Sequence, residues 1–379
     1  MNNMTKIAAL DLFAGAGGLS QGMLEAGIAV KGAVDFWKPA VETHAKNHTS
    51  IKCITADLTK TSPEELFNEL GLSKDDIDII VGGPPCQGFS TVGNRNVVDP
   101  KNQLFLRFVD IVEYAKPPAF VMENVKGILS MKSVRGNKVS DEVVSGFSKL
   151  GYSVSFKLLN AANFGTPQIR ERVFFVGIEK SLKKQPTFPK ITHSEYQTDL
   201  HGNRYFPLIT CWDALSDLPP LEAGEGAEEM GYTQEPKNDY QRNRRKDSSK
   251  LFNHSAPKHS KKVIDRISKI PPGGNYSSLP PEEQNISGYP NIYGRLIADA
   301  PAGTIIGNCG CVSAPGRFVH PFKNRGITVR EAARLQSFPD KFRFFGSNRD
   351  QYLQVGNAVP VMLAKAVTTE VSSVLLENK

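Results

Sequence analysis

The stretch KIAALDLFAGAGGLSQG, residues 6–22, predicts how the chain is built. Its apolar start indicates a buried strand over 6–13, and residues 18–27 are typical of a short helix that ends at a glycine. The turn between them contains Gly15, Gly17 and Gly18. Glycines let the backbone approach a ligand and leave amide groups that point at it. Open α/β sheets bind nucleotides at such a turn, at the carboxyl ends of their strands.

The alternation of strand and helix continues through the first half of the chain. Further strand candidates lie at 28–35, 77–83 and 118–124. A helix is predicted over 103–116, where apolar residues recur at helical spacing. The pattern predicts an α/β fold with a mostly parallel open sheet and helices on both faces. Two strands without an intervening helix, 152–160 and 170–179, indicate an antiparallel pair at the sheet edge.

The length of 379 residues favours one large domain and one smaller domain. Residues 1–182 are predicted to begin the large domain. Residues 183–294 are rich in Pro, Gly, Asn and charge, contain one predicted helix at 259–270, and are predicted to form the smaller domain. Residues 295–379 return to the large domain and end in a helix, so that the large domain is discontinuous.

The composition is that of a soluble enzyme, with 40% hydrophobic and 22% charged residues. There is no run of about 18 apolar residues, so we expect no membrane span and a cytoplasmic location. The cysteines are few, odd in number and irregularly spaced: Cys53, Cys86, Cys211, Cys309 and Cys311. This pattern argues against a disulfide framework and, since no second ligand pair has zinc spacing, against a metal site.

The net charge of +7 suggests a polyanionic partner. Its distribution is more specific, because residues 241–262 contain eight basic residues and one acid. We interpret this run, which includes Arg242, Arg244 and Arg245, as a stripe that contacts phosphates. The alternative is a solvated charged loop.

Several polar residues surround the glycine turn. The spacing is G-x-G-x-x-S, with Ser20 where a dinucleotide fingerprint has Gly or Ala, so it supports a nicotinamide cofactor only weakly. Asp35 ends the second strand and is placed to accept hydrogen bonds from a ribose. Asp57 could face an adenine amino group. Either acid could instead be a local cap or a surface charge.

The loop GGPPCQGFS, residues 82–90, follows a strand and reaches the same sheet edge. Pro84 and Pro85 have fixed φ angles and therefore aim the next side chain, Cys86, as a candidate nucleophile. The alternative is a buried, inert cysteine. Glu123 ends the next strand, where its carboxyl group could act as a general acid. Arg170 and Arg172 are two apart on one predicted strand, where both could orient the glutamate or a phosphate.

Six motifs stand in order over residues 11–360: DLFAGAGGLS, GGPPCQGFS, ENV, QIRERV, REAARLQSFPD and QVGNAVP. In these motifs the sequence resembles the DNA (cytosine-5) methyltransferases of bacterial type. The resemblance implies a Rossmann-like methyltransferase domain. It also implies that residues 183–294 are the target-recognition domain.

The implied cofactor is S-adenosyl-L-methionine. The resemblance would place Phe13 and the glycine turn beneath it and Asp35 at its ribose. Phe36 stands where the family often has tryptophan and keeps an aromatic face. The other implied pocket residues are Asp57, Leu58, Pro85, Leu104, Asn357 and Val359.

The implied reaction methylates C5 of a cytosine extruded from double-stranded DNA, with a transient bond from Cys86 to C6 and with Glu123 at N3. Gln87, Ser90 and the three arginines of the basic stripe would contact the substrate. A cognate restriction endonuclease would be a possible partner. Three alternatives stay open: a transfer-RNA cytosine-5 methyltransferase, a catalytically silent DNA-binding protein and a nicotinamide oxidoreductase.

Overall fold

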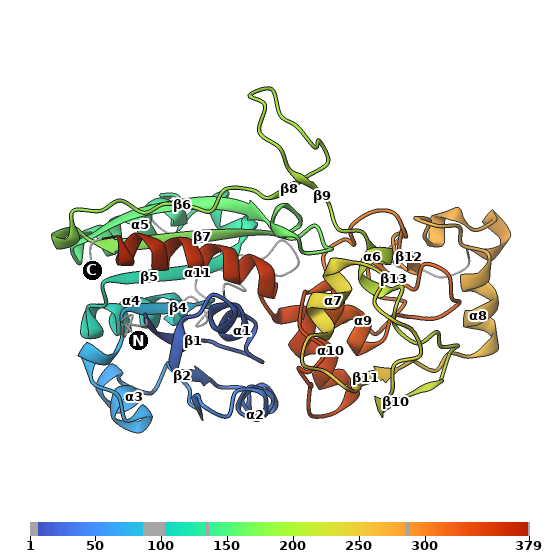
Figure 1. Ribbon diagram of the computed structural model, residues 1–379, viewed down its shortest axis with the longest axis horizontal. Helices are drawn as coiled ribbons and strands as arrows, with labels where there is room; N and C mark the ends of the chain where they lie inside the picture. Colours follow the sequence, from blue (N-terminus) through green and yellow to red (C-terminus); the bar gives the residue numbers. More distant parts are fainter. Residues whose placement is uncertain (1–6, 86–102, 134–135, 285–288, 378–379) are drawn as a thin grey trace. The chain divides into compact units, whose positions relative to one another are not determined.

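The computed structural model describes residues 7–85, 103–133, 136–284 and 289–377, which form two compact units (Figure 1). Unit 1 contains Met1–Asn160, Glu171–Lys190 and Leu363–Lys379. Unit 2 contains Ala161–Arg170 and Ile191–Met362. Residues 295–362, which we predicted to return to the large domain, therefore cluster with unit 2, and the final helix joins unit 1. The division into catalytic and recognition domains stays a prediction.

Unit 1 is built on a seven-stranded sheet with the order β3-β2-β1-β4-β5-β7-β6. Its strands are β1 Ala8–Leu12, β2 Ala29–Asp35, β3 Lys52–Thr55, β4 Ile79–Gly82, β5 Ala119–Val125, β6 Tyr152–Asn160 and β7 Glu171–Glu179. The strands from β3 to β5 pair in parallel, whereas β7 runs antiparallel to both β5 and β6. The predicted sheet, with its antiparallel pair at one edge, is confirmed.

Helices cover both faces of this sheet (Figure 1). They are α1 Gly18–Glu25, α2 Lys38–Asn47, α3 Pro63–Leu70, α4 Gln103–Ala115, α5 Val139–Lys149 and α11 Val361–Leu376. Leu10 and Leu12 face a hydrophobic core shared with residues of α3, α4 and α5. Asp11 lies between them in the strand, so its side chain points to the opposite face, where α1 contacts it through Ser20.

Unit 2 consists of short elements. Its helices are α6 Cys211–Leu215, α7 Asp239–Arg245, α8 Lys261–Ser268, α9 Val329–Leu335 and α10 Asn348–Asn357. Its strands are β8 His193–Ser194, β9 Phe206–Pro207, β10 Gly226–Met230, β11 Leu251–Ser255, β12 Gly294–Arg295 and β13 Arg317–Val319. Among the strand pairs that the structure describes in this unit, β10 and β11 are antiparallel, and the two shorter pairs are parallel.

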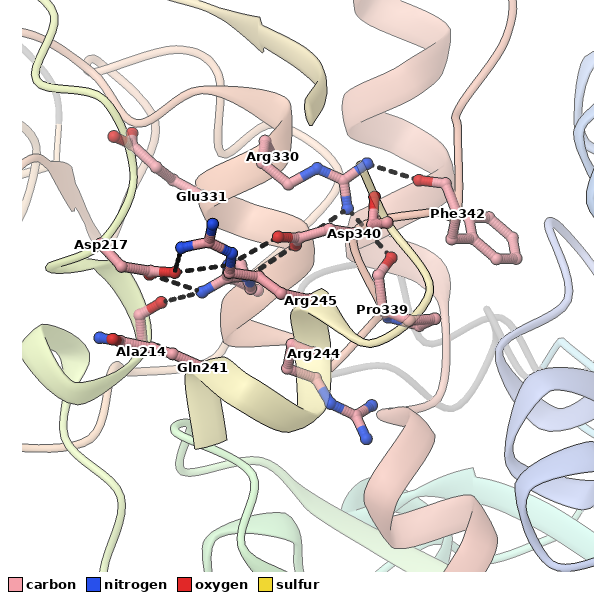
Figure 2. Close-up of polar contacts among 12 residues, drawn as sticks. Ala214, Asp217, Gln241, Arg244, Arg245, Arg330, Glu331, Pro339, Asp340 and Phe342 are labelled. Carbon is pink, nitrogen blue, oxygen red and sulfur yellow. Dashed lines mark hydrogen bonds and ion pairs between the residues drawn. The ribbon is translucent and has the colours of Figure 1, made fainter. Parts of the chain in front are cut away.

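A buried ion network holds these short elements together (Figure 2). Arg334 of α9 donates two hydrogen bonds of 2.6 Å to the carboxylate of Asp340. Its Nη1 also donates to Asp217 at 3.0 Å and to the carbonyl of Ala214 at 2.8 Å. Arg330, one turn earlier, donates to the carbonyls of Pro339 and Phe342. The network therefore fixes α9 to the segment that follows α6.

The segment Asn348–Leu376, which contains α10 and α11, is long and apolar enough to cross a membrane by length and composition alone. More than half of its most apolar window, 56%, is buried within the structure. That burial is typical of core helices in soluble proteins.

Candidate functional site

The glycine turn follows β1 and has the geometry that its sequence requires. Phe13, Gly15 and Gly17 have φ angles of 56°, 55° and 101°. The left-handed values of Gly15 and Gly17 strain other residues, which explains the glycines. A Cβ at Gly15 would meet no atom within 4 Å, so this side of the turn is open. A Cβ at Gly17 would lie 2.8 Å from the ring of His44, so the turn rests on α2.

Asp35 ties this turn to the next strand. Its Oδ2 accepts from the amide of Gly15 at 2.9 Å, and its Oδ1 accepts from the amide of Trp37 at 2.8 Å. Burial raises the pKa of Asp35, and these backbone donors oppose that shift. Beside it, Phe36 is 68% exposed. A carboxylate and an open aromatic face therefore stand at the carboxyl end of β2.

Asp57 and Leu58 are placed differently. Asp57 is exposed, and its Oδ1 accepts from the amide and the hydroxyl of Thr59 at 3.0 and 2.7 Å. The Thr59 hydroxyl lowers the pKa of Asp57. The local cap that we kept as an alternative is thus present in the structure. Leu58 is 3% exposed, and its side chain belongs to the hydrophobic core rather than to a surface.

A second cluster lies where β4 and β5 end. Glu123 of β5 pairs with Arg172 of β7, with 2.9 Å between its Oε1 and the Nε of Arg172. Both side chains are mostly buried, and only 12% of Glu123 is exposed. A Cβ at Gly83 would lie 2.8 Å from the other carboxylate oxygen, so only glycine lets the loop pass this close. The glutamate is thus held against the start of the Pro-Pro loop.

Asn124, which we did not predict, also anchors that loop. Its Nδ2 donates to the carbonyl of Pro84 at 3.2 Å, two residues before Cys86. Pro84 and Pro85 belong to the described chain, whereas Cys86, Gln87 and Ser90 lie outside the described residues. The sequence signal was available, since the asparagine stands beside Glu123 in the ENV motif.

The paired role predicted for Arg170 and Arg172 stays a prediction, and the contacts of Arg170 argue against it. The strand β7 begins at Glu171, and Arg170 precedes it. Arg170 is 3% exposed and donates to the carbonyls of Ile305 and Gly356 at 2.6 and 2.9 Å, all within unit 2. Its Nη1 and Nη2 thus donate to backbone carbonyls of unit 2, whereas Arg172 pairs with Glu123.

The predicted basic stripe is also divided by the structure. Arg244 is 3% exposed and donates to the carbonyl of Ser337. Arg245 donates to the carbonyl of Gln234 at 2.7 Å and stacks over Tyr232. Both guanidinium groups make their contacts within unit 2, which argues against the predicted phosphate contacts. Arg242 remains exposed and pairs with the exposed Asp239.

The remaining predicted pocket residues fall in both units. Pro85 and Leu104 are half-buried residues of unit 1. Asn357 is exposed at the end of α10, and Val359 is 8% exposed, both in unit 2. Among the described residues, no group of three or more His, Cys, Asp or Glu side chains could hold a metal ion.

A family model described as C-5 cytosine-specific DNA methylase matches residues 7–373. The chain is 40% identical to the Type II methyltransferase M.DdeI of Desulfomicrobium norvegicum, over 96% of this chain and 88% of that protein. It is 36% identical to the Type II methyltransferase M1.HphI of Haemophilus parahaemolyticus, over 96% and 86%.

The fold is also found among solved structures. A crystal structure described as a prophage-encoded DNA modification methyltransferase from E. coli superposes with a TM-score of 0.75. The two sequences are 28% identical, and the match covers 98% of this chain and 100% of that one.

Proposed function

The chain belongs to the C-5 cytosine-specific DNA methylase family, and from this premise we propose its substrates and the roles of its residues. It is a DNA (cytosine-5-)-methyltransferase, so the nicotinamide alternative is set aside. In our proposal the methyl group comes from S-adenosyl-L-methionine and goes to C5 of a cytosine flipped out of a specific double-stranded sequence.

One observation supports the assignment of the reaction to the ends of β4 and β5. Glu123 is held by Arg172 and by the close approach of Gly83, while Asn124 holds the carbonyl of Pro84. The carboxyl group and the backbone that leads to Cys86 are therefore fixed to the same strand end. Such preorganisation is what a general acid and a nucleophile need when they act on one ring.

The glycine turn fits the proposed methyl donor. Its open side at Gly15 leaves room for a ligand, and no side chain caps the first amides of α1. Asp35 and the exposed ring of Phe36 supply a carboxylate for hydroxyl groups and a face for a heterocycle. When bound, S-adenosyl-L-methionine supplies an electrophilic methyl group. The resemblance also assigns cofactor contacts to Pro85, Leu104, Asn357 and Val359, whereas the side chains of Asp57 and Leu58 are used locally.

The residues then act on the cytosine ring in sequence. The Cys86 thiolate forms a bond to C6 while Glu123 holds a proton at N3, so that charge does not build up on the ring. C5 becomes nucleophilic and takes the methyl group, while the methyl–sulfur bond of the sulfonium breaks and the donor leaves as a neutral thioether. Loss of the C5 proton to a base and departure of the Cys86 thiolate restore the C5–C6 double bond.

The rest of the chain would supply DNA recognition. We assign residues 1–182 and 295–379 to catalysis and cofactor binding, and 183–294 to target recognition. Relatives at 36–40% identity are named Type II methyltransferases, which supports a role in a cytoplasmic restriction–modification system with a cognate endonuclease. Gln87, Ser90 and Arg242 would contact DNA.

Covalent trapping tests this proposal. We expect wild-type protein, given S-adenosyl-L-methionine and duplex DNA with 5-fluorocytosine at the target, to form a denaturant-stable adduct, because fluorine cannot leave as a proton does. Cys86→Ser should form no adduct and should still bind both substrates. An adduct in that variant would remove Cys86 from its role. Methylation of transfer RNA in place of duplex DNA would favour the RNA alternative.

A further inference from the structure

A chain of polar side chains is buried beneath the glycine turn. The Ser20 hydroxyl donates to Oδ2 of Asp11 at 2.6 Å, and Nε2 of His44 lies 2.9 Å from the same hydroxyl oxygen. All three residues have no solvent exposure. They come from α1, β1 and α2, so the chain joins three elements at one point.

The hydrogen bonds fix the state of the histidine. When Asp11 is ionised, the single proton of the Ser20 hydroxyl goes to Asp11, so Nε2 of His44 is the donor in the second bond. His44 is then a neutral ring with its proton on Nε2. Burial lowers the pKa of His44 to about 3, with the neighbouring His48 adding to the shift, which agrees with a neutral ring.

The same ring supports the turn. A Cβ at Gly17 would lie 2.8 Å from Cδ2 of His44 and 3.1 Å from Nε2 of His48. Gly17 is the N-cap of α1, and no side chain caps that helix end. The position of the first amides of α1 therefore depends on the rings below Gly17 and on Ser20, which anchors the first helical turn.

The arrangement costs stability. Oδ1 of Asp11 and Nδ1 of His44 are buried without a hydrogen-bond partner among the described residues. Each such group costs about 1–3 kcal/mol, and apolar side chains of similar size could fill the space without that cost. A costly polar chain directly under a ligand-binding turn is typical of a functional requirement.

We propose that Ser20 and His44 are positioning residues for the methyl donor, which hold the glycine turn and the first amides of α1 in the conformation that binds it. This inference rests on the proposed function, since it takes S-adenosyl-L-methionine as the ligand. Neither residue needs to touch the ligand, because both act through the backbone of the turn.

Calorimetric titration with S-adenosyl-L-methionine and with its demethylated product tests the proposal. Ser20→Ala should weaken the binding of both by about tenfold, the loss expected for one buried charge-assisted hydrogen bond. His44→Phe should do the same, whereas His44→Gln, whose amide can replace the Nε2 donor, should recover most of the affinity. The kcat at saturating donor and the Kd for duplex DNA should change less than threefold.

The matched control is His254→Gln in unit 2. His254 is also fully buried and uses both ring nitrogens, at 2.9 Å from Thr328 and from the carbonyl of Pro219. Its replacement should lower Tm without changing the donor Kd. Unchanged donor affinity in both Ser20→Ala and His44→Phe, or an equal loss of DNA affinity, would overturn the inference. If the wild type itself bound no S-adenosyl-L-methionine, the proposed function would fail instead.

Discussion

Asp340 in unit 2 and Asp11 in unit 1 are both fully buried carboxylates, yet their surroundings are opposite. Both oxygens of Asp340 accept from Arg334 at 2.6 Å, and Oδ2 also accepts from the Tyr232 hydroxyl at 2.7 Å. Asp11 accepts from the Ser20 hydroxyl, and none of the ion pairs formed by the described residues includes it.

The partners decide the charge of each group. Burial alone would raise the pKa of Asp340, but the charge and hydrogen bonds of Arg334 hold it below its ordinary value. Burial raises the pKa of Asp11 to about 7, and the Ser20 hydroxyl opposes only part of that shift. A buried acid that pairs with a cation thus stays ionised and stabilises the fold through the ion pair. A buried acid without one changes its charge near neutral pH, beside the proposed cofactor turn.

Removing the ion pair between Asp340 and Arg334 should have the largest effect on stability. Asp340→Asn leaves the guanidinium of Arg334 buried with half of its neutralising charge removed, and we expect a loss of about 3–5 kcal/mol in the free energy of unfolding. Denaturant unfolding of the variant and the wild type measures it. Asp239→Asn, which alters an exposed pair with Arg242, is the matched control and should change stability by less than about 0.5 kcal/mol. A loss below 1 kcal/mol in Asp340→Asn would show that the network does not hold unit 2 together.

Glu123 is intermediate between Asp340 and Asp11. It pairs with a cation, Arg172, but lies at a strand end where it is partly exposed. Arg172→Met should reduce kcat about a hundredfold, because the carboxyl group loses the partner that orients it, a magnitude typical of a misplaced catalytic group. Single-turnover methyl transfer measures the chemical step. Arg170→Met is the informative contrast, since its guanidinium binds carbonyls of unit 2 and its loss should appear mainly as lower stability. Equal rates for wild type and Arg172→Met would separate the ion pair from catalysis.

The parallel sheet could be predicted because its central strands are continuous apolar runs. Residues of β1, β4 and β5 are almost entirely buried, and such runs are visible in a single sequence. The helix α2 was missed because its buried face includes Thr43 and His44, so polar residues interrupt the apolar periodicity. In unit 2 the helix predicted over 259–270 is present as α8, whereas α6 and α7 were missed, because buried ion pairs of neighbouring residues rather than apolar stripes hold them.

The site was predictable where one motif contains both partners. Glu123 and Asn124 are neighbours, and the Pro-Pro loop that they hold is itself a motif. The sequence could not predict which arginines are buried, because their hydrogen-bond partners are remote in sequence. The carbonyl that accepts from Arg244 belongs to Ser337, 93 residues away. A charge count cannot distinguish such a buried arginine from an exposed one like Arg242.

Asp11→Asn should change how stability depends on pH. The folded-state pKa of about 7 exceeds the ordinary value of 3.8, so the protonated acid stabilises the fold. That contribution is complete below pH 3.8, falls as pH rises, and is gone above about pH 7. Relative to the asparagine variant, the wild type should therefore lose about 2–3 kcal/mol between pH 5 and pH 7. Unfolding curves at these two pH values measure the difference. A constant difference would mean that Asp11 is ionised throughout, in which case the contrast with Asp340 disappears.

The smallest expected effect concerns the arginines of α7, where one helix contains both an exposed and a buried cation. Arg242 is 54% exposed and pairs only with the carboxylate of Asp239 among the ion pairs of the described residues, so it is available to a phosphate. Arg242→Ala should reduce the slope of log Kd against log salt by about 0.9, the release of one counterion, and should leave the stability within about 0.5 kcal/mol. Arg244→Ala should leave the salt slope unchanged and lower the stability, because its guanidinium donates to the carbonyl of Ser337 within unit 2. Equal salt slopes for Arg242→Ala and the wild type would place the DNA backbone away from α7, and a reduced slope in Arg244→Ala would show that burial does not separate the two arginines.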